Sequence, residues 1–298
     1  MAAEQVLLFG AAGQLGYELH LCLQTAGYAV TALSRQQLDF SDLPAVREQV
    51  KQSQARWIIN AAAYTAVDKA EQEVQTAQTL NADLPTLLAE EAKRLGAALL
   101  HYSTDYVFNG RADRPYLETD ATDPLSVYGR SKRDGELGIK ASGARHLVLR
   151  TSWVVGAHGQ NFLKTMLRLA GERDSLRVVA DQTGVPSSAD WLAGISLQAM
   201  RQADQHGLQG LFHATPAGQT NWHAYAQYLL AQAASLGWTL KLASQDVEPI
   251  STAQYPLPAA RPAYGLLDSQ ALQTQLGQAW PLWQEGVDKV LHQLRPTA

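Results

Sequence analysis

A short apolar segment followed at once by spaced glycines is the feature that most restricts the fold of this chain. Residues 5–9 read QVLLF, a continuous apolar run typical of a strand that is buried on both faces. The run ends at Gly10, and Gly13 and Gly16 precede a segment with helical spacing and a second strand-like run that ends at residue 33. This order predicts a βαβ unit whose helix begins among the glycines.

The glycine turn predicts a site for the phosphates of a dinucleotide cofactor. A helix N-terminus carries partial positive charge and free N–H groups, and glycines let a ligand approach the backbone closely. The spacing here is G-x-x-G-x-x-G, whereas the dinucleotide-binding fingerprint is G-x-G-x-x-G. The alternative interpretation is that Gly10, Gly13 and Gly16 only close the turn between strand and helix.

The residues after the second strand bear on which cofactor binds. Ser34 and Arg35 stand where an acidic residue would bond the adenosine ribose, and neither is acidic. A hydroxyl and a guanidinium suit a 2′-phosphate, so they favour NADPH over NADH. The alternative is that Arg35 is a solvated surface residue. Asp39 and Phe40 follow, and either could border the adenine.

Further apolar runs predict more parallel strands at residues 56–63, 97–102 and 146–155. Strands that alternate with helical segments predict an α/β fold with a Rossmann-like, doubly wound parallel sheet. Such sheets bind ligands at the carboxyl ends of their strands. The residues that would reach this edge are Tyr64, Thr65, Ser103, Thr104, Asp105 and Trp153, of which the tryptophan is equally well explained as a core residue.

A tyrosine and a lysine stand four residues apart after Pro124, in a segment with helical signals. At that spacing Tyr128 and Lys132 share one helix face, so a phenol and an ammonium are expected in one small volume. A fixed positive charge favours the phenolate and lowers a phenol pKa that is about 10 when free. The hydroxyl of Thr104 could steady the same oxygen. This group predicts general acid–base chemistry.

The pattern changes after Gly156. Amphipathic helices such as 161–172 alternate with irregular segments, of which 247–264 is long and rich in proline and alanine. We therefore expect an NAD(P)-binding domain over residues 1–155. Residues 156–298 would form mainly a smaller C-terminal substrate-binding lobe, with some segments returning to the first domain.

Composition and the remaining motifs argue against several classes of function. The formal net charge of −4 offers no basic surface for nucleic acid, and Cys22 is the only cysteine, so no intrachain disulfide is expected. The eight histidines lack metal-ligand spacing, and no G-x-S-x-G motif occurs. The N-terminal apolar run is too short for a signal peptide or a membrane span. We predict a cytoplasmic protein with no metal site, no membrane partner and no nucleic-acid partner.

Longer motifs run along nearly the whole chain. They are GxxGQLG at 10–16, NAAAYTAVDKAE at 60–71, STDYVF at 103–108, YGxSK at 128–132, RTSWV at 150–154, NF at 161–162, DQxGxP at 181–186 and RP at 261–262. Together they resemble the dTDP-4-dehydrorhamnose reductases, a family of extended short-chain dehydrogenases. The resemblance implies NADPH-dependent reduction of the C4 keto group of dTDP-4-dehydro-β-L-rhamnose to dTDP-L-rhamnose, in nucleotide-sugar and lipopolysaccharide O-antigen biosynthesis.

The resemblance also implies roles for single residues. Tyr128 would donate a proton to the substrate C4 oxygen, Lys132 would hold the nicotinamide ribose and lower the tyrosine pKa, and Thr104 would tune that hydrogen bond. The expected NADPH site consists of Gly10, Gly13, Gln14, Leu15, Gly16, Arg35, Asp39, Phe40, Ala63, Tyr64, Thr65, Tyr102, Tyr128 and Lys132. The expected substrate contacts are Thr104, Asp105 and Trp153, with Asn161 and Arg261 on the nucleotide diphosphate.

Some properties do not carry over from the resemblance. With Ser34 and Arg35 after the second strand, NADH stays an alternative to NADPH. Some members dimerise around magnesium, and Glu18 and Asp190 are acidic positions that could serve, but two carboxylates far apart in sequence are usually surface residues. No magnesium site is predicted, and a monomer and a homodimer are both compatible with the sequence.

Two other functions compete with a reductase. A sugar-nucleotide dehydratase or epimerase shares the fold, but a dehydratase is expected to carry Asp then Glu after the threonine, and here Asp105 is followed by Tyr106. A non-catalytic regulatory subunit could keep a reductase-like fold without its chemistry. Such a subunit could lose Tyr128 or Lys132 without penalty, yet both are present together with Thr104.

Overall fold

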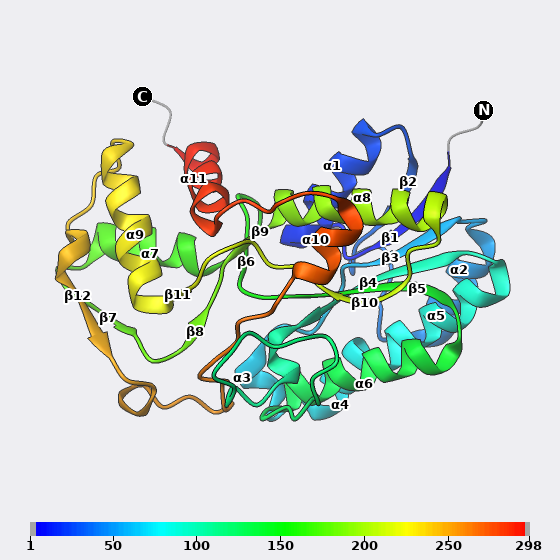
Figure 1. Ribbon diagram of the computed structural model, residues 1–298, viewed down its shortest axis with the longest axis horizontal. Helices are drawn as coiled ribbons and strands as arrows, with labels where there is room; N and C mark the ends of the chain where they lie inside the picture. The colour runs from blue at the N-terminus through cyan, green and yellow to red at the C-terminus, as the bar shows by residue number, and fades with distance from the viewer. Residues whose placement is uncertain (1–3, 296–298) are drawn as a thin grey trace.

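The computed structural model describes residues 4–295 and contains a central six-stranded sheet (Figure 1). Its spatial order is β10-β5-β4-β3-β1-β2, and every neighbouring pair is parallel. The strands are β1 (Gln5–Phe9), β2 (Ala29–Leu33), β3 (Trp57–Asn60), β4 (Ala98–Thr104), β5 (Arg145–Thr151) and β10 (Gly210–His213). The chain order reverses between β1 and β3, which is the switch point where such sheets bind ligands. The predicted α/β, doubly wound parallel sheet is confirmed.

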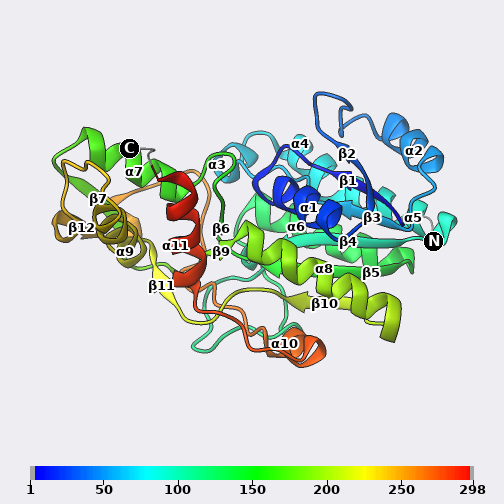
Figure 2. The same ribbon diagram turned by 90° about the horizontal axis from the view of Figure 1, so that it is seen from above.

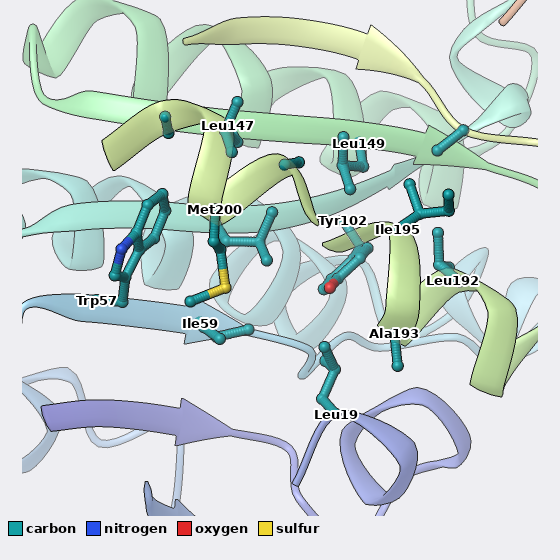
Figure 3. Close-up of a cluster of buried hydrophobic side chains, with 14 of the residues drawn as sticks. Leu19, Trp57, Ile59, Tyr102, Leu147, Leu149, Leu192, Ala193, Ile195 and Met200 are labelled. Carbon is teal, nitrogen blue, oxygen red and sulfur yellow. The ribbon is translucent and has the colours of Figure 1, made fainter. Parts of the chain in front are cut away.

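Helices cover both faces of the sheet (Figure 2). One face carries α1 (Gln14–Thr25) and α8 (Ala189–His206), and the other carries α2 (Leu43–Gln52), α5 (Leu84–Leu95) and α6 (Val127–Ser142). Alternate strand residues point to opposite faces, so two separate hydrophobic cores form. The core under α8 includes Trp57, Ile59, Leu147, Leu149, Leu192 and Met200 (Figure 3), and the core on the other face includes Leu7, Ile58, Leu88, Leu99 and Val148.

A second lobe extends from the carboxyl edge of the sheet, at the left of Figure 1. It contains α7 (Phe162–Glu172), α9 (Trp222–Ser235), α11 (Trp283–Leu294) and the parallel pair of β7 (Leu176–Val179) with β12 (Val247–Ile250). These elements share a core of their own around Leu163, Tyr225, Leu229 and Val287. The segment 247–264, expected to be irregular, therefore begins with a strand, because its first residues pair with β7.

Segments from the second half of the chain return to the sheet. Helix α8 covers one sheet face, β10 adds a strand beside β5, and α10 (Gln270–Leu276) packs near β10 and α8. The boundary at residue 155 stays a prediction. The remaining elements are α3 (Val67–Ala70), α4 (Val74–Gln78), a π-helical turn (Thr79–Asp83), β6 (Val154–Val155), β8 (Thr183–Gly184), β9 (Ser187–Ser188), β11 (Thr220–Asn221) and 3-10 turns at Asp105–Val107, Ser244–Asp246 and Thr252–Gln254.

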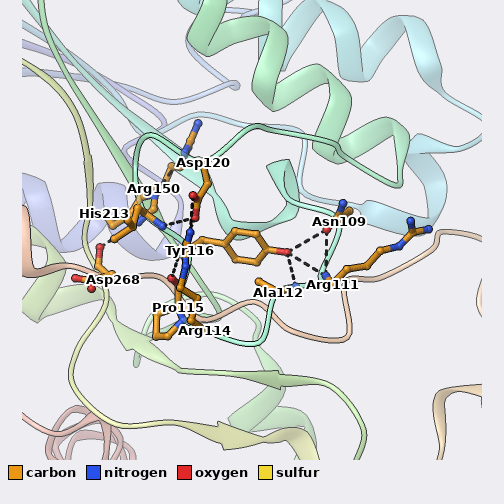
Figure 4. A network of polar contacts seen from close by, with 11 residues as sticks. Asn109, Arg111, Ala112, Arg114, Pro115, Tyr116, Asp120, Arg150, His213 and Asp268 are labelled. Atoms are coloured by element: carbon orange, nitrogen blue, oxygen red, sulfur yellow. Dashed lines mark hydrogen bonds and ion pairs between the residues drawn. The ribbon is translucent and has the colours of Figure 1, made fainter.

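Hydrogen bonds and an ion pair hold the polar loop at 110–124 in place (Figure 4). The Tyr116 hydroxyl donates to Asn109 Oδ1 at 3.1 Å and accepts from the Arg111 N–H at 3.0 Å. Arg114 forms a two-pronged ion pair with Asp120, with both N···O distances 2.9 Å. These contacts favour an ordered surface loop.

The close approach of α1 to the end of β1 requires glycine at residue 16. A Cβ atom at Gly16 would lie 2.0 Å from the carbonyl oxygen of Gly10, and neither backbone segment can give way. We expect Gly16→Ala to lower the free energy of unfolding by about 3 kcal/mol, as overpacking against backbone does. Urea denaturation followed by circular dichroism measures this loss.

The matched control is Gly194→Ala in the middle of α8, where an added Cβ meets nothing within 4 Å. That variant should be about 0.5–1 kcal/mol more stable, because alanine has the higher helix propensity. Equal effects of the two substitutions would contradict the steric explanation.

Candidate active site

Strand β4 and helix α6 bring the three predicted catalytic side chains together. Thr104 is the last residue of β4, while Tyr128 and Lys132 lie on successive turns of α6. Helix α6 begins where it does because Ser126 Oγ accepts a hydrogen bond from the Gly129 N–H at 3.2 Å. The Thr104 hydroxyl lies close enough to the Tyr128 phenol to influence its pKa. The predicted proximity of phenol and threonine is thus present in the structure.

The pKa of Tyr128 is raised to about 12, mainly because protein surrounds the phenol and excludes water. The nearby Thr104 hydroxyl lowers this pKa, and the nearby Asp105 carboxyl raises it. The sequence predicts the opposite direction, a pKa lowered by Lys132. That prediction is wrong for the structure as it stands, because desolvation exceeds the favourable contacts.

Lys132 is buried, with a side chain that is 2% exposed, and it binds protein groups. Its Nζ donates to the carbonyl oxygen of Tyr102 at 2.6 Å and lies 3.1 Å from His101 Nε2. Burial lowers the pKa of Lys132 to about 8, and the Glu136 carboxylate acts in the other direction. The cation is therefore held in place but destabilised.

A buried ion pair fixes α6 against the sheet. The Arg150 guanidinium, on β5, donates to both carboxylate oxygens of Glu136 on α6, at 2.8 and 2.6 Å. The two side chains are 4% and 7% exposed, and the guanidinium also lies over the Phe108 ring, 5.0 Å from its centroid. Both charges are therefore satisfied within the protein, and the helix that carries Tyr128 and Lys132 has a fixed position.

The glycines of the predicted phosphate site lie at the N-terminus of α1. Gly13 precedes the helix, and no side chain caps the first N–H groups, which leaves them free for an anion. The N–H groups of Gly10 and Ala11 donate to the carbonyl of Leu33, so the end of β2 lies against the turn. These features fit a dinucleotide pyrophosphate.

Gln14 links this turn to the second lobe. Asn161 Nδ2 donates to Gln14 Oε1 at 2.8 Å and to the Gly156 carbonyl at 2.7 Å, and Asn161 Oδ1 caps α7. The structure therefore gives Asn161 a helix-capping role beside the predicted cofactor site. Leu15, another predicted cofactor residue, is 9% exposed and packs in the core under α1.

The residues expected at the adenosine, Ser34 and Arg35 at its ribose and Asp39 and Phe40 at its adenine, differ in exposure. Arg35 is exposed after β2, while the Ser34 N–H and hydroxyl both donate to Gln37 Oε1. The Ser41 hydroxyl and N–H donate to Asp39, which lowers the pKa of that carboxyl. Phe40 is 6% exposed, and its ring meets Phe9 edge-on with centroids 5.4 Å apart. Phe40 is thus mainly a core residue.

The loop after β3, with Ala63, Tyr64 and Thr65, is fixed by a residue that the sequence did not reveal. Asn81, in the π-helical turn, accepts from the Tyr64 N–H at 2.8 Å and donates to the Tyr64 carbonyl at 3.1 Å. Its amide also donates to Ser131 Oγ at 3.0 Å. Asn81 therefore sets the distance between this loop and α6. The sequence feature that could have pointed to Asn81 is its position as an asparagine within an apolar stretch of helical character.

Tyr102 is oriented differently from the prediction. Its hydroxyl lies 2.6 Å from Ser196 Oγ on α8, so its ring is buried in the core on the sheet face opposite α6. Only the backbone carbonyl of Tyr102 faces Lys132. Strand alternation explains why the Tyr102 ring points to this core, and the prediction that Tyr102 lines the cofactor site stays a prediction.

The predicted substrate residues lie in three places. Asp105 is 2% exposed next to Thr104, whose hydroxyl donates to it at 3.0 Å. Trp153 has a positive φ of 45° and stacks on Trp222 with ring centroids 3.7 Å apart. Arg261 binds both carboxylate oxygens of Asp68, at 3.1 and 2.8 Å. Trp153 and Arg261 thus have protein partners.

Within residues 4–295, no three His, Cys, Asp or Glu side chains are grouped so that they could hold a metal ion. Asp190 forms an ion pair with Lys289, and the Asp190 carboxylate raises the pKa of the nearby Glu18 after burial, the larger cause. The absence of a magnesium site stays a prediction. No helix in this part of the chain combines the length and apolar character needed to cross a bilayer.

The fold and the site together define a class. A glycine turn at the switch edge of a doubly wound sheet, with a Tyr-x-x-x-Lys helix and a threonine beside it, is the arrangement of a Rossmann-like short-chain dehydrogenase/reductase. The family model described as RmlD substrate binding domain matches residues 4–295. The chain belongs to the dTDP-4-dehydrorhamnose reductase family, as its motifs predict.

Individual relatives match over almost the full length. The chain is 43% identical over 297 residues to dTDP-4-dehydrorhamnose reductase of Shigella flexneri, covering 98% of each. The crystal structure of a dTDP-4-dehydrorhamnose reductase from Clostridium acetobutylicum has a TM-score of 0.91 at 34% identity and covers 98% of this chain and 100% of its own. The Bacillus anthracis enzyme in complex with NADP has a TM-score of 0.89 at 33% identity, with coverage of 98% and 99%.

Asp105 generates a pH-dependent prediction. Burial raises its pKa to about 7, against about 4 in an unfolded chain, so between these values the folded protein binds the extra proton. Asp105 therefore lowers the free energy of unfolding by about 1.4 kcal/mol per pH unit as pH rises from 4 to 7. We expect Asp105→Asn to gain stability relative to the wild type over that window and to keep a constant difference above it.

Urea denaturation of both proteins at pH 4, 5, 6, 7 and 8 measures this difference. Parallel stability curves across the whole range would mean that Asp105 is ionised in the folded protein.

Proposed function

We propose that the chain catalyses the NADPH-dependent reduction of the C4 keto group of dTDP-4-dehydro-β-L-rhamnose to dTDP-L-rhamnose. The observation that carries this function is the meeting of Tyr128, Thr104 and Lys132 at the end of β4. Support also comes from the relatives that bear this enzyme's name at 43% identity. The dTDP-sugar is then the small-molecule partner, and the product serves cell-surface polysaccharide synthesis.

The residues around the switch edge fit NADPH. The uncapped N-terminus of α1, with Gly10, Gly13 and Gly16, would hold the pyrophosphate, and exposed Arg35 would meet the 2′-phosphate. Lys132 would hold the nicotinamide ribose. Gln14, Leu15, Asp39, Ala63, Tyr64 and Thr65 would line the remaining site. When bound, NADPH supplies the hydride for the reduction.

Tyr128 would be the general acid. Its raised pKa keeps the proton on the phenol at neutral pH, so the group is loaded before reaction. The phenol can give this proton up once negative charge develops on the C4 oxygen of the sugar. Thr104, whose hydroxyl lies near the phenol, would steady the phenol oxygen or the substrate oxygen beside it, and Asp105 and Trp153 would contact the deoxysugar.

The diphosphate contacts need a separate proposal. Asn161 donates both amide N–H groups, to Gln14 and to the Gly156 carbonyl, so it would reach the nucleotide only after releasing one of them. Arg261 would reach it through the guanidinium N–H groups that do not bind Asp68. No contact of the described residues favours a dehydratase or a regulatory subunit over the reductase. We place the enzyme in the cytoplasm. Monomer and homodimer stay alternatives, which light scattering on the purified protein distinguishes.

Replacing the general acid tests the reaction directly. We expect Tyr128→Phe to bind NADPH with near wild-type affinity but to turn over about a hundredfold or more slowly, because the proton donor is lost. NADPH oxidation with the 4-keto sugar nucleotide, followed by absorbance, gives the turnover, and fluorescence titration gives the affinity. Near-normal turnover would refute the role of Tyr128.

The control is Tyr228→Phe, which removes a phenol that binds Asp288 in the second lobe. It should leave turnover close to that of the wild type.

Replacing Arg35 tests the cofactor preference. We expect Arg35→Ala to weaken NADPH binding roughly tenfold or more and to leave NADH binding nearly unchanged, because only NADPH carries the 2′-phosphate. The control is Gln36→Ala, an exposed neighbour that should affect neither cofactor. Equal losses for both cofactors would mean that Arg35 does not contact the 2′-phosphate.

A further inference from the structure

Lys132 is one end of a buried series of hydrogen-bonded side chains. Its other members, His101 and Asn60, have no role in the proposed reaction. His101 Nε2 lies 3.1 Å from Lys132 Nζ, and His101 Nδ1 lies 3.2 Å from Asn60 Nδ2. His101 and Asn60 are register partners on β4 and β3, and they are 0% and 1% exposed. Asn60 Oδ1 in turn accepts from the Ala62 N–H at 3.1 Å. Each member of the chain is thus fixed by the next.

The donors and acceptors around His101 determine which of its ring nitrogens carries the proton. The ring is neutral, because burial, and then the nearby Lys132, hold the pKa of His101 well below its usual range. Asn60 Oδ1 is engaged with a backbone N–H, so its amide nitrogen faces His101 and donates to Nδ1. A neutral imidazole has one N–H, which must then be on Nε2.

This tautomer constrains the charge of Lys132. The Nε2–H of His101 points at Nζ, and only an uncharged amine has the lone pair to accept it. An ammonium would require the other tautomer, and that tautomer would leave the Asn60 amide nitrogen facing an N–H unless the amide turned and gave up Ala62. The charge of Lys132 and the tautomer of His101 are therefore coupled through Asn60.

We propose that His101 is a positioning residue that, together with Asn60, holds Lys132 Nζ on the Tyr102 carbonyl and favours its uncharged amine. This inference rests on the proposed function, in which Lys132 belongs to the reductase site. Asn60 and His101 would then set the pH at which the site loses its cation.

Other ionisable groups on the surrounding elements act differently. Glu136 on α6 stabilises the ammonium, but its carboxylate is shared with Arg150. Burial raises the pKa of both Tyr128 on α6 and Asp105 beyond the end of β4, so Tyr128 is uncharged through the neutral range and Asp105 is uncharged below about pH 7. Burial of Lys132 opposes the effect of Glu136, and the proposed N–H donor of His101 would act in the same direction as burial.

The tautomer can be read directly. Protein with ¹⁵N-labelled histidine shows in a long-range ¹H–¹⁵N spectrum which ring nitrogen carries the proton, and His101→Gln assigns the signal. Protein with ¹³C-labelled lysine gives the titration of Lys132, assigned with Lys132→Met. We expect a proton on Nε2 of His101 above about pH 8, where Lys132 is the amine, and a proton on Nδ1 below that pH, where Lys132 is the ammonium. A proton on Nδ1 above that pH in the wild type, or a single tautomer across the whole titration of Lys132, would overturn the proposal whether or not any variant folds.

Asn60→Asp tests the coupling. The carboxylate accepts from both the Ala62 N–H and an Nδ1–H, so it should switch His101 to the other tautomer and raise the proton affinity of Lys132 roughly tenfold or more. The matched control is His213→Gln, since His213 is also fully buried but contacts Arg150 and the Asp268 carbonyl. That control should leave the Lys132 titration unchanged.

An unchanged tautomer or an unchanged Lys132 titration in Asn60→Asp would overturn the coupling. These spectra need neither substrate nor NADPH, so a wrong substrate assignment and a wrong role for His101 give separate results. In the reductase assay, the alkaline limb of kcat/KM for Asn60→Asp should move to higher pH, because the ammonium persists further. A purely structural role of Asn60 would lower kcat/KM without moving that limb.

Discussion

Two buried cations hold helix α6 against the sheet, and the geometry of the site depends on them. Arg150 and Glu136 join β5 to α6, and Lys132 joins α6 to the backbone of β4. Charges removed from water are costly unless they are paired and fully hydrogen-bonded, so each contact tolerates little displacement. The helix thereby carries the Tyr128 phenol to the Thr104 hydroxyl with little freedom to shift along the sheet.

The same burial that fixes the helix also sets the chemistry. Water exclusion raises the pKa of Tyr128 and lowers that of Lys132, so the acid keeps its proton while the lysine is close to losing its own. The same exclusion of water raises the pKa of Asp105 to about 7. At neutral pH the phenol is therefore uncharged, Asp105 is near the midpoint of its titration and Lys132 still carries most of its charge, so a negative charge that develops on a substrate oxygen has a cation nearby.

The sequence predicts those features that depend on spacing, and fails where partners are distant. The βαβ unit and the Tyr128–Lys132 pair follow from apolar runs, glycines and a four-residue interval. The hydrogen bond of Asn161 with Gln14 and the pairing of Arg261 with Asp68 join residues more than a hundred positions apart, so no local sequence pattern predicts them. The predicted direction of the Tyr128 pKa shift is wrong, because the spacing of residues does not show how much water the folded protein excludes from the phenol.

The repeated crossing of the chain between sheet and second lobe has a mechanical consequence. After β5 the chain enters the lobe for α7, returns as α8 and β10, leaves again for α9, returns as α10 and ends in α11. A rotation of one lobe on the other would have to bend all of these connections together, and no single hinge peptide could absorb it. Neither half can be expressed alone with an intact interior, so swapping lobes between relatives would require splicing at every crossing.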